Sequence, residues 1–99
     1  MGLEMTDYEM VTIVSPEVDG ERLTEIIDWL GKLVTARGGE VESTEQWGIR
    51  KLAYPVKKFM EANYVLTQFK LESGLTREVG AELKASEDIL RHLIVKREG

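Results

Sequence analysis

The sequence predicts an α+β fold in which two helices cover one face of a four-stranded antiparallel sheet. Two observations carry this prediction. Apolar residues recur at helical spacing in two segments, and the other apolar segments are extended runs rich in β-branched and aromatic residues. The segments follow one another as strand, helix, strand, strand, helix and strand. Two right-handed crossovers joined by a hairpin then give the strand order 4-1-3-2, which is the ferredoxin-like sandwich.

The first strand is expected over residues 8–14, where apolar side chains occupy both alternating sets of positions, as they do inside a sheet. After Ser15-Pro16, Asp19 is placed to cap a helix. Gly38-Gly39 is placed to end this helix, because glycine adopts the left-handed conformation at little steric cost. Between these signals the helix carries one apolar stripe, made of Leu23, Ile26, Ile27, Leu30 and Val34.

A long extended segment over residues 41–56 is expected next, with a bulge between residues 48 and 51. The bulge explains why the inward-facing positions change parity along the segment. They are Val41, Trp47 and Ile49 before the bulge, and Leu52, Tyr54 and Val56 after it. Residues 57–63 connect this strand to a third one over residues 64–71, and the two strands form a hairpin.

A second helix follows, capped by Ser73 or Thr76, with Val79 and Leu83 in an apolar stripe less regular than the first. The final strand is expected over residues 90–96, where apolar side chains alternate and Arg91 lies on one face of the strand. Both helices pack on the same face of the sheet, so the other face is open to a ligand, an RNA or another protein.

The composition indicates one domain over residues 1–99, because 42% apolar residues in a chain of 99 are enough for a single packed core. Residues 1–6 are expected to be a flexible N-terminus and residues 97–99 a short C-terminal end. No apolar run is long enough to cross a bilayer, and the N-terminus lacks the pattern of a signal peptide. With no cysteine in the chain, we expect a cytoplasmic protein without disulfides.

Four cations stand among aromatic residues in one segment of this otherwise acidic chain, whose net charge is −5. They are Arg50, Lys51, Lys57 and Lys58, and no carboxylate occurs between Glu45 and Glu61. A locally positive strip of this kind is suited to phosphate groups. The alternative is an exposed strand edge whose charges only maintain solubility and discourage edge-to-edge pairing.

The residues that carry this strip also resemble the bacterial small-subunit ribosomal protein bS6 family. The resemblance rests on Tyr8-Glu9 in the first strand, on the segment Gly48-Ile49-Arg50-Lys51-Leu52-Ala53-Tyr54-Pro55-Val56, on Tyr64 and on the terminal segment 88–96. It implies a ribosomal protein without catalytic activity or cofactor. It further implies a monomer that forms a heterodimer with ribosomal protein bS18 and binds the central domain of 16S rRNA with it during assembly.

The resemblance also indicates which residues bind. Arg50 and Lys51 match the basic pair of the family, while Arg91 and Lys96 match the basic positions that open and end the last strand. Lys57 and Lys58 are proposed from their charge alone. Two departures weaken the expected interface: Asn63 stands where many members have glycine, and the sequence stops at Gly99, where many members continue into a tail that grips the partner.

Three aromatic residues of the hairpin, Trp47, Tyr54 and Tyr64, are candidates for stacking on RNA bases. Packing in the core or against a protein partner is favoured instead, because the third strand lacks the aromatic signature of RNA-recognition domains. His92 is the only histidine and no cysteine accompanies it, so a structural role is favoured over a metal site.

An enzyme is not expected, because the sequence has no phosphate loop, nucleophile elbow or His-Glu-x-x-His motif. The alternative function is a ferredoxin-like regulatory or oligomerisation module that binds a small ligand or its own copy through the open sheet face. Salt separates the two readings, since binding to RNA weakens steeply with salt and apolar self-association does not.

Overall fold

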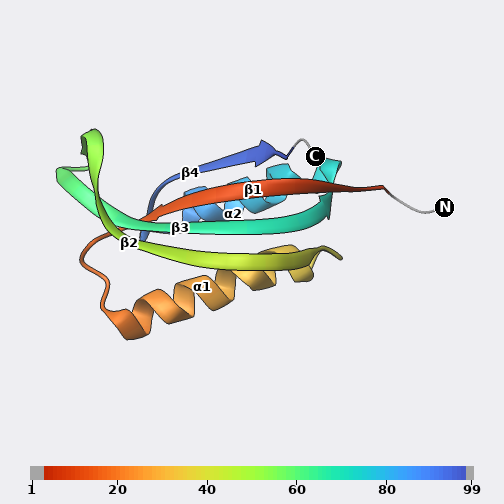
Figure 1. The fold of residues 1–99 in the computed structure, drawn as a ribbon, viewed down its shortest axis with the longest axis horizontal. Helices are drawn as coiled ribbons and strands as arrows, with labels where there is room; N and C mark the ends of the chain where they lie inside the picture. Colours follow the sequence, from red (N-terminus) through yellow and green to blue (C-terminus); the bar gives the residue numbers. More distant parts are fainter. Residues whose placement is uncertain (1–3, 98–99) are drawn as a thin grey trace.

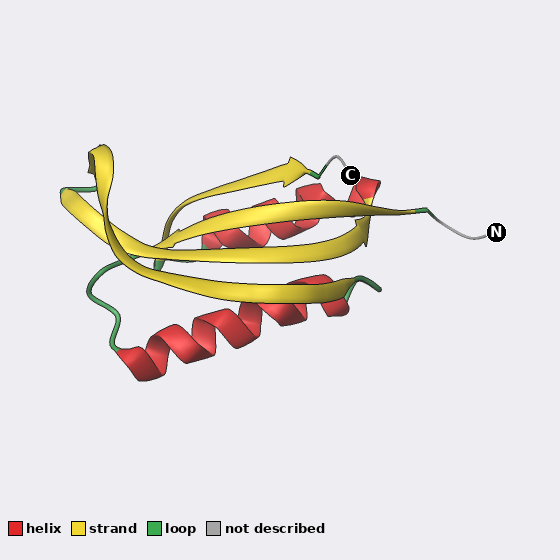
Figure 2. Cartoon of the chain, viewed as in Figure 1, coloured by secondary structure: helices red, strands yellow, loops and turns green. Residues whose placement is uncertain are grey.

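A computed structural model describes residues 4–97 of the chain, with the elements in the expected order (Figures 1 and 2). They are β1 (Met5–Val14), α1 (Gly20–Thr35), β2 (Glu40–Val56), β3 (Phe59–Glu72), a 3₁₀ turn (Ser73–Leu75), α2 (Thr76–Ala85) and β4 (Ile89–Lys96). The sheet is antiparallel with the order β2-β3-β1-β4, which is the predicted order read from the other edge. The ferredoxin-like fold is therefore confirmed.

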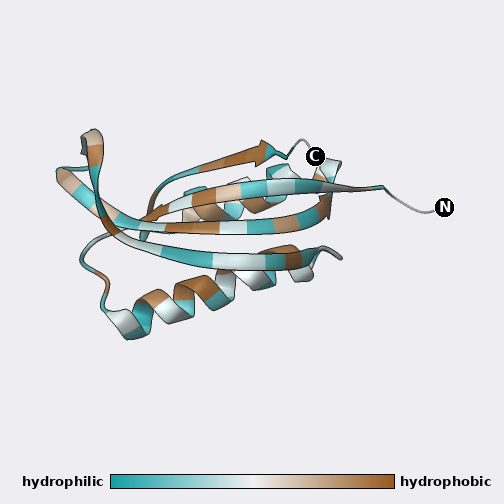
Figure 3. Ribbon diagram, viewed as in Figure 1, coloured by the Kyte–Doolittle hydropathy of each residue, from teal (hydrophilic) through white to brown (hydrophobic). Residues whose placement is uncertain are grey.

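The core lies between the sheet and the two helices. Alternate residues of the central strands point into it. Figure 3 shows apolar and polar residues recurring along α1, whose apolar residues contribute to the same core. Its largest fully buried side chains are Phe69, Met10, Leu30, Leu71 and Leu83. The Tyr8 and Phe69 rings stack across the β1–β3 pair with their centroids 5.6 Å apart. No helix within residues 4–97 is long and apolar enough to cross a membrane.

Helix α1 begins and ends where the sequence indicates. The Asp19 side chain accepts a hydrogen bond from the Arg22 backbone N–H at 2.8 Å, which caps the helix. After the last turn Gly38 has φ +85°, and the Gly39 N–H donates to the Val34 carbonyl at 3.0 Å. These contacts reverse the chain into β2.

Helix α2 begins differently from the expectation. Its N-cap residue is Leu75, which makes no side-chain cap, and the Thr76 hydroxyl donates to the Ser73 carbonyl instead. The predicted cap at Ser73 or Thr76 is therefore wrong, because Thr76 is already the first residue of the helix and Ser73 begins the 3₁₀ turn that precedes it.

All four strands are longer than predicted, and two of them, β1 and β3, by more than one residue. β1 begins at Met5, which pairs with Glu72, so residues 5 and 6 of the N-terminal segment that is expected to be flexible belong to the strand. The same expectation for residues 1–3 falls outside the described residues. β3 begins at Phe59 rather than Tyr64, so the predicted connection over residues 57–63 shrinks to two residues. As a result the β2–β3 hairpin continues beyond the end of β1 (Figure 1).

Candidate nucleic-acid and partner interface

Ion pairs divide the cations of this protein into two groups. Within residues 4–97, carboxylates pair with Arg22, Arg37, Lys70 and Arg97. None of these ion pairs includes a basic residue expected at the site, and every one of those residues is exposed: Arg50, Lys51, Lys57, Lys58, Arg91 and Lys96. Their charges face solvent without a carboxylate partner in the described part of the chain.

Arg50 and Lys51 lie in the half of β2 that runs past β1. They pair with Ala62 and Glu61 of β3, beyond the last β1 partner, Asn63. The Arg50 guanidinium lies 5.0 Å from the centroid of the Trp47 ring, a cation–π contact that restricts where the guanidinium can point. This half of β2 therefore presents its cations on an arm with no third strand beside it.

The expectation that Trp47, Ile49 and Tyr54 face inward is wrong. Their exposed fractions are 39%, 50% and 56%, and no residue of β2 is buried. The physical reason is that β2 is an edge strand, and for Tyr54 also that β2 continues beyond the last pair of β1 with β3. The register of β2 against β3 shifts between Val41 and Ser43, between Gln46 and Gly48, and between Lys51 and Val56, so two shifts lie at the ends of the predicted bulge. Gly48 has a φ of +80°.

Lys57 and Lys58 are the two residues of the turn at the hairpin tip, flanked by the paired residues Val56 and Phe59. Both lysines have positive φ, +49° and +76°. A two-residue hairpin turn with positive φ at both positions normally contains asparagine and glycine, and other residues pay a steric cost there. Two ammonium groups without an ion-pair partner among residues 4–97 thus occupy a turn whose conformation lysine does not favour.

A hollow of about 330 Å³ lies on the open face of the sheet. Tyr54 of β2 and Arg91 of β4 come together at this hollow, although β3 and β1 separate their strands in the sheet. The guanidinium of Arg91 lies 5.4 Å from the centroid of the Tyr54 ring and donates a hydrogen bond to its hydroxyl. The end of β2 therefore bends across the open face. The hollow is also lined by Val11, Ile13, Leu52, Ala53, Tyr64, His92 and Leu93.

Several of these lining residues were not predicted as site residues. Val11 and Ile13 form the second apolar parity of β1, and the sequence places them on the sheet face away from Met10 and Val14. With both helices on one face, that parity marks apolar side chains on the open face. This signal was present in the sequence, whereas the bend that brings Leu52 over them was not.

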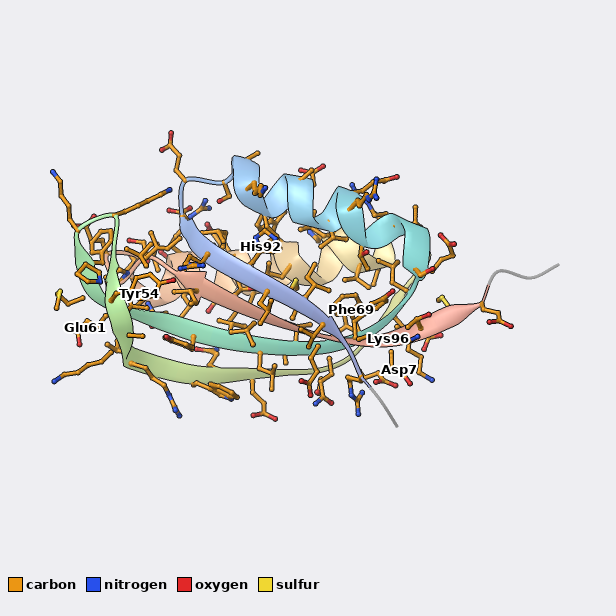
Figure 4. The ribbon with its side chains drawn as sticks, turned by 90° about the horizontal axis from the view of Figure 1, so that it is seen from above. Asp7, Tyr54, Glu61, Phe69, His92 and Lys96 are labelled. Atoms are coloured by element: carbon orange, nitrogen blue, oxygen red, sulfur yellow. The ribbon has the colours of Figure 1, made fainter. Side chains whose placement is uncertain are left out.

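The remaining two candidates lie apart from the hairpin. Lys96 pairs with Tyr8 near the opposite end of β4, so the structure does not bring it to Arg50 or Lys51. His92 lies between β4 and α2 (Figure 4), close to Gly80. Burial lowers the pKa of His92 below its ordinary value, and the charge of Lys84 lowers it further, so the imidazole is neutral near pH 7. The described residues contain no cluster of side chains able to hold a metal ion.

Comparisons with known proteins agree on one family. The family model described as Ribosomal protein S6 matches residues 7–96. The small ribosomal subunit protein bS6 of Heliobacterium modesticaldum is 43% identical over 94 residues, which cover 95% of this chain and 98% of that protein. The bS6 protein of Clostridioides difficile is 41% identical over 91 residues, covering 92% of this chain and 98% of the relative.

The fold is also similar to that of a solved member. The crystal structure of 30S ribosomal protein S6 from Thermotoga maritima superposes with a TM-score of 0.89 and 26% sequence identity, covering 95% of this chain and 89% of that chain.

Proposed function

The chain belongs to the bS6 family of bacterial small-subunit ribosomal proteins, and on this premise we propose that it binds the central domain of 16S rRNA together with bS18. As a member of this family it is a structural protein of the cytoplasmic ribosome and not an enzyme. What remains to be assigned is which part of its surface binds RNA and which part binds bS18.

The observation that carries the RNA part of the proposal is the set of unpaired cations on the β2–β3 hairpin. Arg50, Lys51, Lys57 and Lys58 are exposed and have no ion-pair partner within residues 4–97, in a chain of net charge −5. Lysine and arginine position a protein on phosphates by charge rather than by reading bases. These four residues, with Arg91 and Lys96, are the proposed phosphate contacts.

The hollow on the open sheet face is the proposed docking surface for bS18. Apolar side chains of three strands line it, and Tyr54 and Tyr64 add aromatic surface. Two of its lining side chains, Tyr54 and Leu93, are exposed. Exposed apolar patches of this kind commonly mark protein interaction sites. Trp47 contributes through its contact with Arg50 rather than through the hollow.

RNA binding is tested by titrating a 16S central-domain fragment with this protein, with and without bS18. We expect weak binding alone and strong binding with bS18, and a steep loss of affinity with salt. Arg50→Gln and Lys51→Gln should each weaken the complex, whereas Lys32→Gln, an equal charge change at an exposed position of α1, should not. Equal losses in all three variants would contradict specific contacts by the hairpin.

Partner docking is tested separately by calorimetric titration with bS18 in the absence of RNA. Leu93→Asp places a charge beside the hollow at a side chain that is 59% exposed, so the fold tolerates it and heterodimer formation should be lost. Met60→Asp is the matched control, because Met60 is 64% exposed and does not line the hollow. Self-association through the hollow, seen as a salt-insensitive dimer in solution, would favour the oligomerisation module instead.

A further inference from the structure

A second basic surface lies at the β4 edge of the sheet, between α2 and β4. Two hollows of about 520 and 320 Å³ share Lys84 and His92 and together form one groove, called here the α2–β4 groove. Arg77 lines one of its ends, and Lys57 and Arg91 line the other. Within the described residues no carboxylate side chain lines either hollow. Four cations and no acid line this groove, which is unexpected in a chain with more acidic than basic residues. The guanidinium of one of them, Arg91, contacts Tyr54 at the open-face hollow, so Arg77, Lys84 and Lys57 supply the free charges.

The α2 wall of the groove is a single stripe along the helix. Gly80 and Ala81 lie three and four residues after Arg77, and Lys84 lies three residues after Ala81, so all four lie on one side of the helix and line the groove. The two small residues in the middle keep the groove open, while the cations stand at its ends. Seven residues of helix separate Arg77 from Lys84 by about 10 Å. That distance is similar to the Debye length at physiological salt, so the two cations repel each other only weakly.

The opposite flank of α2 has the reverse charge. Glu78 and Glu82 lie there, and both pair with Arg37 of α1, at 3.0 and 3.5 Å. Helix α2 thus has a basic flank toward β4 and an acidic flank toward α1. Because the acids of this helix are engaged with Arg37, they do not neutralise the groove, and Arg77 and Lys84 take part in none of the ion pairs within residues 4–97.

The β4 wall of the groove is the free edge of the sheet, since β4 pairs only with β1. His92 of this wall is labelled in Figure 4. At the end where β4 begins, the groove reaches Arg91 and Lys57 of the hairpin turn. The same Lys57 belongs to the hairpin cations. The groove and the hairpin strip are therefore continuous, and one extended polyanion can contact both.

We propose that the α2–β4 groove holds a stretch of RNA sugar–phosphate backbone, with Arg77 and Lys84 as phosphate-binding residues that extend the hairpin contacts. This inference rests on the proposed function, because it assigns a second contact surface to the same RNA. A strand of phosphates fits the spacing of the cations along a groove, whereas a single small anion requires donors that converge on one point. The contacts carry no base specificity, because lysine and arginine meet phosphates mainly through charge.

The first test measures the affinity of the heterodimer with bS18 for the 16S central-domain fragment over a range of salt concentrations. Arg77→Gln and Lys84→Gln should each weaken binding roughly threefold to tenfold and reduce the slope of log Kd against log salt by about one. Lys32→Gln carries the same charge change on α1 and should alter neither quantity. Binding to bS18 alone should be unchanged in all three variants. An effect on the heterodimer instead of on RNA would overturn the proposal in favour of a protein partner.

The second test uses the absence of cysteine from the sequence. An iron chelate tethered at Ala81→Cys, on the groove, should cleave the RNA backbone in the bound complex, while the same chelate at Ala36→Cys, after α1, should not. If the wild-type heterodimer binds RNA and Ala81→Cys produces no cleavage, the groove assignment fails and the proposed function stands. If the wild-type heterodimer binds no RNA, the proposed function fails and the groove assignment falls with it.

Discussion

Two partly buried glycines of this protein differ in whether a side chain could be accommodated at their position. A Cβ atom at Gly39 would lie 2.7 Å from a Val34 methyl group and 2.9 Å from one of Leu71, and it would also overlap the Lys70 backbone carbonyl. A Cβ atom at Gly80 would meet only the Nε2 atom of His92, at 3.4 Å, which is an ordinary contact. The absence of a side chain is thus needed at Gly39 and tolerated at Gly80.

Gly39→Ala should therefore lower the free energy of unfolding by about 2 kcal/mol or more, because backbone and core must move to accept the methyl group. Gly80→Ala should raise it by up to about 1 kcal/mol, the difference in helix propensity between the two residues. Urea unfolding followed by circular dichroism measures both. A stable Gly39→Ala variant would show that the junction between α1 and β2 is looser than the packing indicates.

His92 gives the stability a pH dependence whose direction follows from its pKa. Burial and the charge of Lys84 lower the pKa of His92 in the folded state, so the unfolded chain binds the proton more readily. The stabilisation is complete above the ordinary histidine pKa of 6.5 and is lost as the pH falls through the folded value. Unfolding of wild type and His92→Gln between about pH 8 and pH 5 should show this loss only in the wild type. Parallel curves would contradict the role of His92.

The hairpin turn combines an unfavourable conformation with charge. Replacing Lys57→Asn and Lys58→Gly supplies the residues that a turn with two positive φ values prefers. We expect the free energy of unfolding of this double variant to exceed that of the wild type by about 1 kcal/mol or more. We expect its RNA affinity to be lower, because two ammonium groups are removed. Opposite changes in the two measurements would mean that the lysines are kept for binding. If stability and RNA affinity both fell, the turn would not be strained.

The elements differ in how well their residues specify them. Helix α1 could be predicted from end to end, because Asp19, the apolar stripe and Gly38 all act locally. The hairpin turn could not, because Lys57-Lys58 carries none of the usual turn residues and only the pairing of β2 with β3 holds it in place. The predicted inward orientation of Trp47 and Tyr54 was wrong for a related reason. Their alternation indicates a strand, but whether anything covers that strand depends on where β1 and the helices end.

At the scale of the whole molecule, the paired cations connect distant elements. Arg37 of α1 pairs with Glu78 and Glu82 of α2, Arg22 pairs with Asp88 before β4, and Arg97 pairs with Glu42 of β2. The six basic side chains predicted as site residues all lack such partners among residues 4–97, and so do Lys32, Arg77 and Lys84, which the sequence did not single out. The α2–β4 groove could not be predicted, because it depends on which flank of α2 faces β4.

This division between paired and unpaired cations predicts that equal changes of charge have different effects. Removing a paired cation should lower stability, and removing an unpaired cation of the hairpin should lower RNA affinity. Arg37→Gln should lower the free energy of unfolding by about 1 kcal/mol, since the Arg37 side chain also donates to the Leu33 carbonyl, and should leave RNA affinity unchanged. Lys51→Gln should weaken RNA binding and leave stability unchanged. Thermal unfolding and RNA titration on the same two variants decide this. If both variants lost affinity equally, the effect would be one of net charge and not of position.

The central position of β1 also sets the order in which the fold can be completed. Val11 pairs with Leu66 of β3 on one side and with Leu93 of β4 on the other. β1 is synthesised first, so it can be paired on both sides only after β3 and β4 have been synthesised. Such long-range pairing makes folding slow compared with helical proteins. A growing chain that has reached only α2 still has one edge of β1 unpaired and open to wrong partners. Synthesis of Ile89–Lys96 therefore does more than add a strand: it covers the open edge of the central strand β1, and the shorter strand β4 becomes the edge of the sheet in its place.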